Sequence, residues 1–150
     1  MTIEIGDPAP EFTLLSQAKE PLSLESLKGR KTLVVFIPFP FTGVCTDEVC
    51  ELQENLGRLN ALDANVVVIT CDTVPTNAKW AQLEGLEFPI LSDYWPHGAV
   101  SEAYGTFNDR LGVARRSTYV LDKTGIITDI IRSDGPRTAR NYEDYVAALT

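Results

Sequence analysis

The chain has 150 residues, 44% of them hydrophobic, which is enough to bury the core of one domain over residues 1–150 without structural metals or disulfides. The formal net charge of -8 argues against nucleic acid and anionic membranes as partners, because both require clustered Lys and Arg. No apolar stretch is long enough to span a membrane and the first residues do not resemble a signal peptide, so we expect a cytoplasmic protein.

The first half of the chain alternates strand-like and helix-like segments. Residues 32–37 form an apolar, β-branched run that predicts a buried strand, and helical spacing of apolar residues predicts a helix through at least Leu59. Residues 65–70 predict the next strand. A further helix is expected to open at Pro75 and to end at Gly85, followed by a short strand over residues 88–91.

The second half predicts a hairpin and a last helix. Residues 117–122 and 126–131 read as strands joined by the turn 123–125, and Asn141 is a good N-cap for a helix through Ala148. Strand-helix units followed by a hairpin and a helix predict one compact α/β unit.

Cys45 lies at the junction between the first predicted strand and its following helix. The preceding residues 38–44, Pro-Phe-Pro-Phe-Thr-Gly-Val, form a proline-stiffened loop with few polar groups. At a helix start the first N–H groups lack helical partners and the dipole is positive, so a thiolate is favoured over a thiol. The local sequence therefore predicts a reactive cysteine.

Pro38, Thr42 and Cys45 form the pattern Pro-x-x-x-Thr-x-x-Cys, and here the chain resembles the peroxiredoxin family of thiol peroxidases. Residues 6–12 are similar to the family's N-terminal Gly-x-x-Ala-Pro-x-Phe motif, and residues 116–120 to its Arg-x-Thr-aromatic-Val strand. Residues in two further segments, 91–100 and 103–108, most resemble the alkyl hydroperoxide reductase E group of actinobacteria. The resemblance implies a thioredoxin-like fold with peroxiredoxin insertions, in which helices flank a central mixed sheet.

The resemblance also implies an activity, the reduction of hydrogen peroxide and small organic hydroperoxides without a metal or organic cofactor. The Cys45 thiolate would attack the O–O bond and become a sulfenic acid. Greater ionisation of the Cys45 thiol raises the rate of peroxide reduction by roughly tens of fold at most. Hydrogen-bond donors that stabilise the breaking O–O bond in the transition state must therefore supply the rest of the rate acceleration. Arg116 would provide charge and N–H donors, the Thr42 hydroxyl would orient the peroxide, and the Val44 and Cys45 amides would add donors. Pro38 would shield the thiolate from bulk water.

Two of these assignments have alternatives. Arg115 competes with Arg116, but on a strand the two point to opposite faces, and Arg116 shares its side with Thr118. Both arginines could instead be solvated surface charges. Glu48 either orders the site's hydrogen bonds, as the resemblance implies, or is an ordinary first-turn acid favoured by the helix dipole.

Cys50 matches the resolving position of the bacterioferritin-comigratory, or Q-type, peroxiredoxins, where it condenses with the sulfenic acid. The resemblance to the reductase E group does not predict it. On an intact helix Cys45 and Cys50 lie roughly 7.5 Å apart along the axis and about 140° apart around it, so a disulfide requires unwinding of the first turn. Otherwise Cys50 is a small buried apolar residue and an external thiol reduces Cys45.

The remaining cysteine and the histidine are expected to be structural. Three cysteines are an odd number, which excludes a complete set of disulfides and favours chemistry over scaffolding in a reducing compartment. Cys71 follows a buried strand and should lie in the core. His97 is flanked by Pro96 and Gly98 and should be a loop or subunit-contact residue, although a Cys-His hydrolase would have to use it as base. Paired short ligand spacing is absent, so zinc is not expected.

An external reductant of the thioredoxin, glutaredoxin or mycoredoxin type is implied, and a homodimer is expected. Phe39, Phe41, Tyr94 and Trp95 would supply apolar contacts around the active site, or would line the domain's own core and substrate mouth. The alternative functions are a thiol redox sensor or chaperone on the same fold and a disulfide oxidoreductase, although Cys-x-x-Cys is absent.

Overall fold

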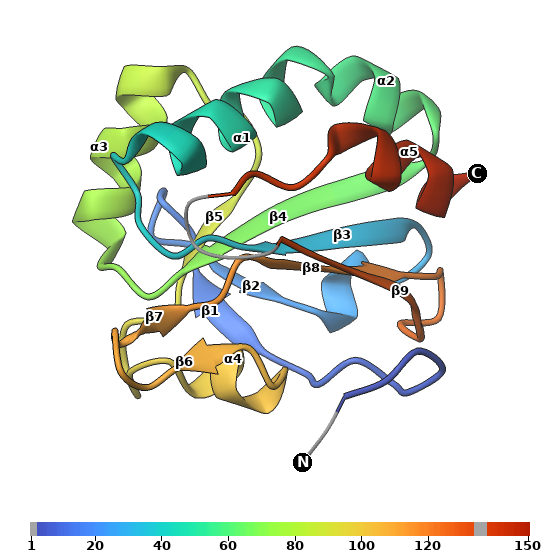
Figure 1. Ribbon diagram of the computed structural model, residues 1–150, viewed down its shortest axis with the longest axis horizontal. Coiled ribbons are helices and arrows are strands. Elements are labelled where there is room, and N and C mark those ends of the chain that lie inside the picture. Colours follow the sequence, from blue (N-terminus) through green and yellow to red (C-terminus); the bar gives the residue numbers. More distant parts are fainter. Residues whose placement is uncertain (1–2, 134–137) are drawn as a thin grey trace.

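The computed structural model describes residues 3–133 and 138–150 (Figure 1). The strands are β1 Thr13–Leu15, β2 Pro21–Ser23, β3 Lys31–Phe36, β4 Ala64–Thr70, β5 Ile90–Ser92, β6 Phe107–Asn108, β7 Val113–Ala114, β8 Ser117–Leu121 and β9 Ile127–Arg132. The helices are the 3-10 helix η1 Glu25–Leu27 and the α-helices α1 Gly43–Glu54, α2 Leu56–Ala61, α3 Val74–Glu84, α4 Ala99–Ala103 and α5 Tyr142–Leu149.

Seven of the strands form one mixed sheet in the order β2-β1-β5-β4-β3-β8-β9. The interior strand β3 pairs in parallel with β4 and antiparallel with β8, and β4 pairs in parallel with β5. Figure 1 shows α1, α2 and α5 over one face of the sheet, and α4 with the β6-β7 hairpin on the other side. The fold class expected from the sequence, a mixed sheet flanked by helices, is confirmed.

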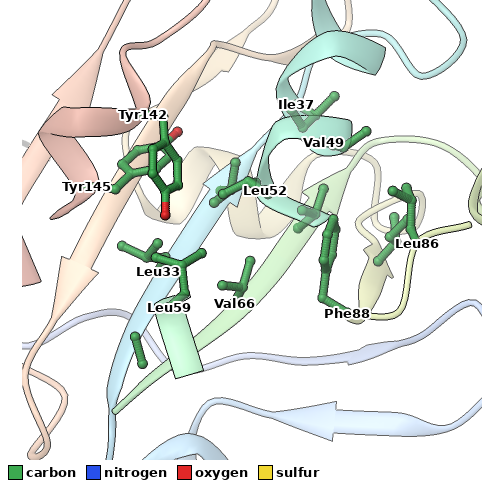
Figure 2. Close-up of a cluster of buried hydrophobic side chains, with 14 of the residues drawn as sticks. Leu33, Ile37, Val49, Leu52, Leu59, Val66, Leu86, Phe88, Tyr142 and Tyr145 are labelled. Atoms are coloured by element: carbon green, nitrogen blue, oxygen red, sulfur yellow. The ribbon is translucent and has the colours of Figure 1, made fainter. Parts of the chain in front are cut away.

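Both faces of the sheet are buried, as the apolar run in β3 predicts. Because side chains alternate along a strand, Leu33 and Val35 face the helical layer, while Val34 and Phe36 face the opposite core. Figure 2 shows the first of these clusters, in which side chains of α1 and α2 meet those of the sheet and of α5. Burial of this cluster fixes the position of α1.

Gly85 and Asn141 act at the helix ends where the sequence predicts them, whereas α3 begins at Val74, one residue before the predicted Pro75. The Thr73 side chain accepts a hydrogen bond from the Thr76 N–H at the start of α3, and Gly85 ends that helix in the left-handed conformation. Asn141 accepts from the Glu143 N–H at the start of α5. The turn between β8 and β9 is closed by Asp122, whose carboxylate accepts from the Thr124 N–H.

Other boundaries differ from the expectation. The helix after Cys45 ends at Glu54, and Asn55 separates it from α2 with the non-helical angles φ -104 and ψ 12. Strand β5 begins at Ile90 rather than at residue 88, since Pro89 has no N–H to give to a ladder. The short elements β1, β2, β6, β7 and α4 were not expected. In the described part of the chain, the helices are too short or too polar to cross a membrane.

Candidate active site

Cys45 is the third residue of α1, and the loop that leads to it leaves the interior strand β3. Val49 and Leu52 lie one and two turns further on the same helix face and are packed in the core with it. Cys45 has no exposed surface. The core therefore holds the helix so that its first turn presents the sulfur toward the sheet.

Arg116 contacts the sulfur from the neighbouring strand. It directly precedes β8, in which Ser117 pairs with Phe36 at the end of β3, so the antiparallel register brings Arg116 beside the loop that carries Cys45. Its Nη2 donates a hydrogen bond to Cys45 Sγ at 3.2 Å. Arg116 is buried whereas Arg115 is exposed, as the strand alternation indicated.

Glu48 lies one turn after Cys45 and joins two arginines. Its Oε1 accepts hydrogen bonds from Arg116 Nη1 and, at 2.9 Å, from Arg140 Nη2. Its Oε2 accepts from the backbone N–H and the Nε of Arg140, both at 2.8 Å. The contacts of Glu48 therefore join it to both arginines beside Cys45, which favours the ordering role over that of an ordinary first-turn acid.

The charge of Glu48 is maintained despite its burial. Burial alone would raise the pKa of this carboxyl, but the hydrogen bonds and charge of Arg140, with the charge of Arg116, outweigh it and hold the pKa below its usual value. Two guanidinium groups and one carboxylate leave one net positive charge in the cluster. A thiolate at Cys45 would neutralise it.

Arg140 is the residue that the sequence analysis missed. Its side chain has no exposed surface, and Nη1 also donates to the Phe36 carbonyl oxygen at 2.9 Å and to Thr118 Oγ1 at 3.2 Å. It lies between β9 and α5, immediately before the capping residue Asn141. An isolated arginine in a polar connection has no periodicity that marks it as buried, so no signal in the sequence distinguishes it from a surface charge.

The loop before α1 places the other expected residues around its first turn. Pro38 is buried and lies two residues after the end of β3. The Thr42 hydroxyl donates to the Phe39 carbonyl oxygen at 2.6 Å and is exposed. Because the Thr46 N–H makes the first helical bond, to Thr42, the amides of Val44 and Cys45 lie in the turn that has no helical acceptors.

Cys50 is not beside Cys45. The helix is continuous between them, and Cys50 Sγ donates to the Glu84 carboxylate of α3 at 3.4 Å. Partial burial, followed by the hydrogen bond and charge of Glu84, raises the pKa of this thiol. In this conformation Cys50 is a protonated thiol held against α3.

Cys71 and His97 have structural surroundings. Cys71 is buried after β4, and its burial raises the pKa to about 11. His97 lies in a loop, where its ring nitrogens contact the carbonyl oxygens of Tyr94 at 3.1 Å and Gly112 at 2.7 Å. Through Gly112 it supports the β6-β7 hairpin. Within residues 3–133 and 138–150, His, Cys, Asp and Glu form no cluster suited to a metal ion.

A cavity of about 260 Å³ lies beside the cysteine site. Its lining includes the buried residues Pro38 and Arg116, and Arg116 is the one that contacts Cys45 Sγ. The β6-β7 hairpin contributes Leu111 and Val113, and its outer wall includes Arg115 and Arg132. Its volume is large enough for a small organic molecule.

Comparison with known proteins places these features in context. The sequence pattern of the AhpC/TSA family matches residues 5–130. Alkyl hydroperoxide reductase E of Mycobacterium tuberculosis is 40% identical over 151 residues, which cover 99% of both chains. The thiol peroxidase of Bacillus subtilis is 31% identical over 144 residues, covering 95% of this chain and 83% of that protein.

The fold agrees with these relatives. The crystal structure of peroxidoxin BcpB from Mycobacterium tuberculosis superposes with a TM-score of 0.87 and 27% identity, over 98% of this chain and 96% of that chain. The expected thioredoxin-like fold and the similarity to the reductase E group are thereby confirmed.

Proposed function

The chain belongs to the AhpC/TSA family and is a peroxiredoxin-type thiol peroxidase that reduces hydroperoxides, and we propose that Cys45 is the residue that attacks the peroxide. The observation that carries this proposal is the hydrogen bond from buried Arg116 to Cys45 Sγ at 3.2 Å. Glu48 holds that guanidinium in place and is itself held by Arg140.

The proposed reaction is a displacement at oxygen. The Cys45 thiolate attacks the terminal oxygen of ROOH, an S–O bond forms, the O–O bond breaks, and the alkoxide leaves and takes a proton to become ROH. Cys45 is oxidised to the sulfenic acid. Arg116 is placed to stabilise the thiolate and the charge that develops on the leaving oxygen, since a buried guanidinium costs no reorganisation during the reaction.

Thr42, Pro38 and the amide of Val44 complete the proposed site. We expect the Thr42 hydroxyl, which now donates to Phe39, to turn toward a bound peroxide. Pro38 keeps bulk water from the sulfur. The amides of Val44 and Cys45 add donors at the positive end of α1.

Two routes are proposed for the second half of the cycle. In one, Cys50 leaves Glu84, the first turns of α1 unwind, and the two sulfurs form a disulfide that a thiol protein of the thioredoxin, glutaredoxin or mycoredoxin type reduces. In the other, an external thiol attacks the Cys45 sulfenic acid directly. The intact helix and the protonated Cys50 in this structure favour the second route. The first route becomes available only if oxidation of Cys45 unwinds the start of α1.

We also propose that the protein forms a homodimer and is located in the cytoplasm. Phe41, Tyr94 and Trp95 are exposed apolar side chains, whereas Phe39 packs against the protein's own core. We propose that the three exposed aromatics contact a second copy of the chain. All three cysteines are free thiols, which suits a reducing compartment, and the single seven-stranded sheet supports one domain over residues 1–150.

Cys45→Ser tests the proposal. A hydroxyl is a far weaker nucleophile than a thiolate, so the variant should fold as the wild type does and consume no hydrogen peroxide in the presence of a thiol reductant. Circular dichroism checks the fold. Cys71→Ser is the matched control and should retain full turnover, because Cys71 belongs to the core cluster on the opposite face of the sheet from Cys45. Persistent peroxide consumption by Cys45→Ser would refute the proposal.

A further inference from the structure

The cavity beside Cys45 has an uneven distribution of charge. Its lining includes three arginines, Arg115, Arg116 and Arg132, and among the described residues that line it there is no carboxylate. The whole chain has a formal net charge of -8. A cationic cavity in an acidic protein raises the local concentration of anions and repels cations.

Only one of these arginines serves the reacting cysteine. Arg116 is engaged with Cys45 and Glu48. Arg115 and Arg132 are exposed, and neither forms a salt bridge with any residue in 3–133 or 138–150. Their charges are therefore available to a ligand.

The rest of the wall suits a hydrocarbon group. Pro38 lies at the inner end, and Leu111, Val113 and Ala114 come from the β6-β7 hairpin. The hairpin is held by His97, which contacts the Gly112 carbonyl oxygen at 2.7 Å and packs edge-to-face against Phe107 with the ring centroids 6.0 Å apart. The wall is thus a preformed surface and not an unsupported loop.

We propose that Arg115 and Arg132 make this enzyme selective for organic hydroperoxides that carry a carboxylate. This rests on the proposed role of Cys45. The O–O group lies at Arg116, the hydrocarbon body contacts the hairpin wall, and the carboxylate pairs with the two outer guanidinium groups. The chemical step is the one already given, in which Cys45 gains one oxygen and ROOH is reduced to ROH, and the carboxylate leaves unchanged.

The test compares two hydroperoxides that differ only in charge, the para-carboxylate of cumene hydroperoxide and its methyl ester. The reduced protein is mixed with each in single turnover without reductant, and the rate of Cys45 oxidation is followed by quenching and mass measurement. The acid should react about tenfold faster than the ester at low ionic strength, and this preference should shrink as salt is added.

Variants then locate the preference. Arg115→Gln with Arg132→Gln should bring the acid and the ester to nearly equal rates and leave the rate with hydrogen peroxide within about twofold of wild type. The control Lys79→Gln removes one positive charge from α3, outside the cavity, and should keep the full preference. Each single arginine variant should show an intermediate ratio, which keeps the test usable if the double variant folds poorly.

Several results would overturn the inference. Equal rates for the acid and the ester in the wild type would do so. A double variant that keeps the full preference for the acid would also do so, as would one that loses its reaction with hydrogen peroxide to the same extent as its reaction with the acid. If the arginines instead bind a carboxylate-bearing thiol such as glutathione, the double variant would slow only the reduction step, and the inference would be wrong. Failure of all three peroxides to oxidise Cys45 would instead refute the proposed function.

Discussion

Glu48 is a buried residue whose charge depends on its partners. Its side chain is 7% exposed and contacts both Arg116 and Arg140. Burying an ionised carboxylate is costly unless it is paired and hydrogen-bonded, and here both oxygens accept from guanidinium groups. The two arginines are thereby fixed in position relative to Cys45.

Arg140→Met should destabilise the fold by about 3 kcal/mol, because it leaves Glu48 with one of its two cationic partners and removes the contact to Phe36. Urea unfolding measures the loss. Adding Glu48→Gln to Arg140→Met should recover part of the lost stability, because the buried cluster then no longer contains a charged carboxylate. A double variant as unstable as the sum of the two single variants would contradict this coupling.

Acid should weaken the same cluster. The folded pKa of Glu48 is below its usual 4.5, so its contribution to stability is fully present above about pH 4.5 and is lost as the pH falls through the folded value. We expect the free energy of unfolding of the wild type to fall more steeply below pH 4.5 than that of Glu48→Gln. Parallel curves for the two proteins would show that another carboxylate controls acid stability.

Arg116→Ala should slow peroxide reduction by a larger factor than the loss of thiolate explains, because it also removes a donor to the O–O bond. Arg140 still neutralises Glu48, so the variant should fold. Stopped-flow oxidation across a pH series measures the effect. Complete recovery of the rate at high pH would restrict Arg116 to a role in ionising the thiol.

At this scale the sequence identified the residues of the first turn of α1 and Arg116 beside them. The choice of Arg116 over Arg115 follows from strand alternation, and burial agrees with it. Arg140 could not be found in that way, since its burial depends on a contact with Glu48 that spans 92 residues. The functional roles of these residues stay predictions.

At the scale of elements, side-chain contacts attach α1 to α3 and to the segment that follows α3. Trp80 Nε1 donates to Thr46 Oγ1 at 3.2 Å, directly after Cys45. Near the other end, Gln53 accepts from the Glu87 N–H at 2.8 Å and donates to its carboxylate at 3.0 Å. Cys50 lies between these contacts. Any disulfide with Cys45 therefore requires at least the Thr46 contact to break.

Cys50→Ser should leave the first oxidation of Cys45 nearly as fast as in wild type, because attack on peroxide does not use Cys50. If Cys50 resolves the sulfenic acid, the variant should accumulate it and overoxidise, and the oxidised wild type should gain hydrogen exchange across residues 45–50. Peptide mapping after one equivalent of peroxide shows whether Cys50 resolves the sulfenic acid. A free Cys50 thiol beside a lasting Cys45 sulfenic acid in wild type would establish a one-cysteine enzyme.

Long elements were predictable and short ones were not. The runs that became β3, β4, β8 and β9 have clear apolar patterns, and the caps of α3 and α5 have specific residue types. By contrast, β6 and β7 have two residues each, too few for any periodicity. The β6-β7 hairpin, which forms part of the cavity wall, therefore could not be predicted from the sequence pattern.

At the scale of the whole molecule, the exposed aromatic residues are the contact that we propose for a second copy of the chain. Trp95 is 81% exposed and Tyr94 50%. Trp95→Glu should place a charge in that contact and shift the protein toward monomer in sedimentation equilibrium. Leu83→Glu is the matched control, because Leu83 is 60% exposed on α3, outside the proposed contact. An unchanged oligomeric state in Trp95→Glu would remove this face from the interface.

The site is also assembled late. Cys45 and Arg116 are 71 residues apart, and Glu48 and Arg140 are 92 apart, so both arginines of the cluster are supplied by the second half of the chain. During synthesis the cysteine leaves the ribosome long before its arginines do. A nascent chain therefore carries an ordinary thiol, and it becomes sensitive to peroxide only when the C-terminal part has folded onto the sheet. We therefore expect unfinished chains to be oxidised at Cys45 more slowly than the folded protein in a cell under peroxide stress.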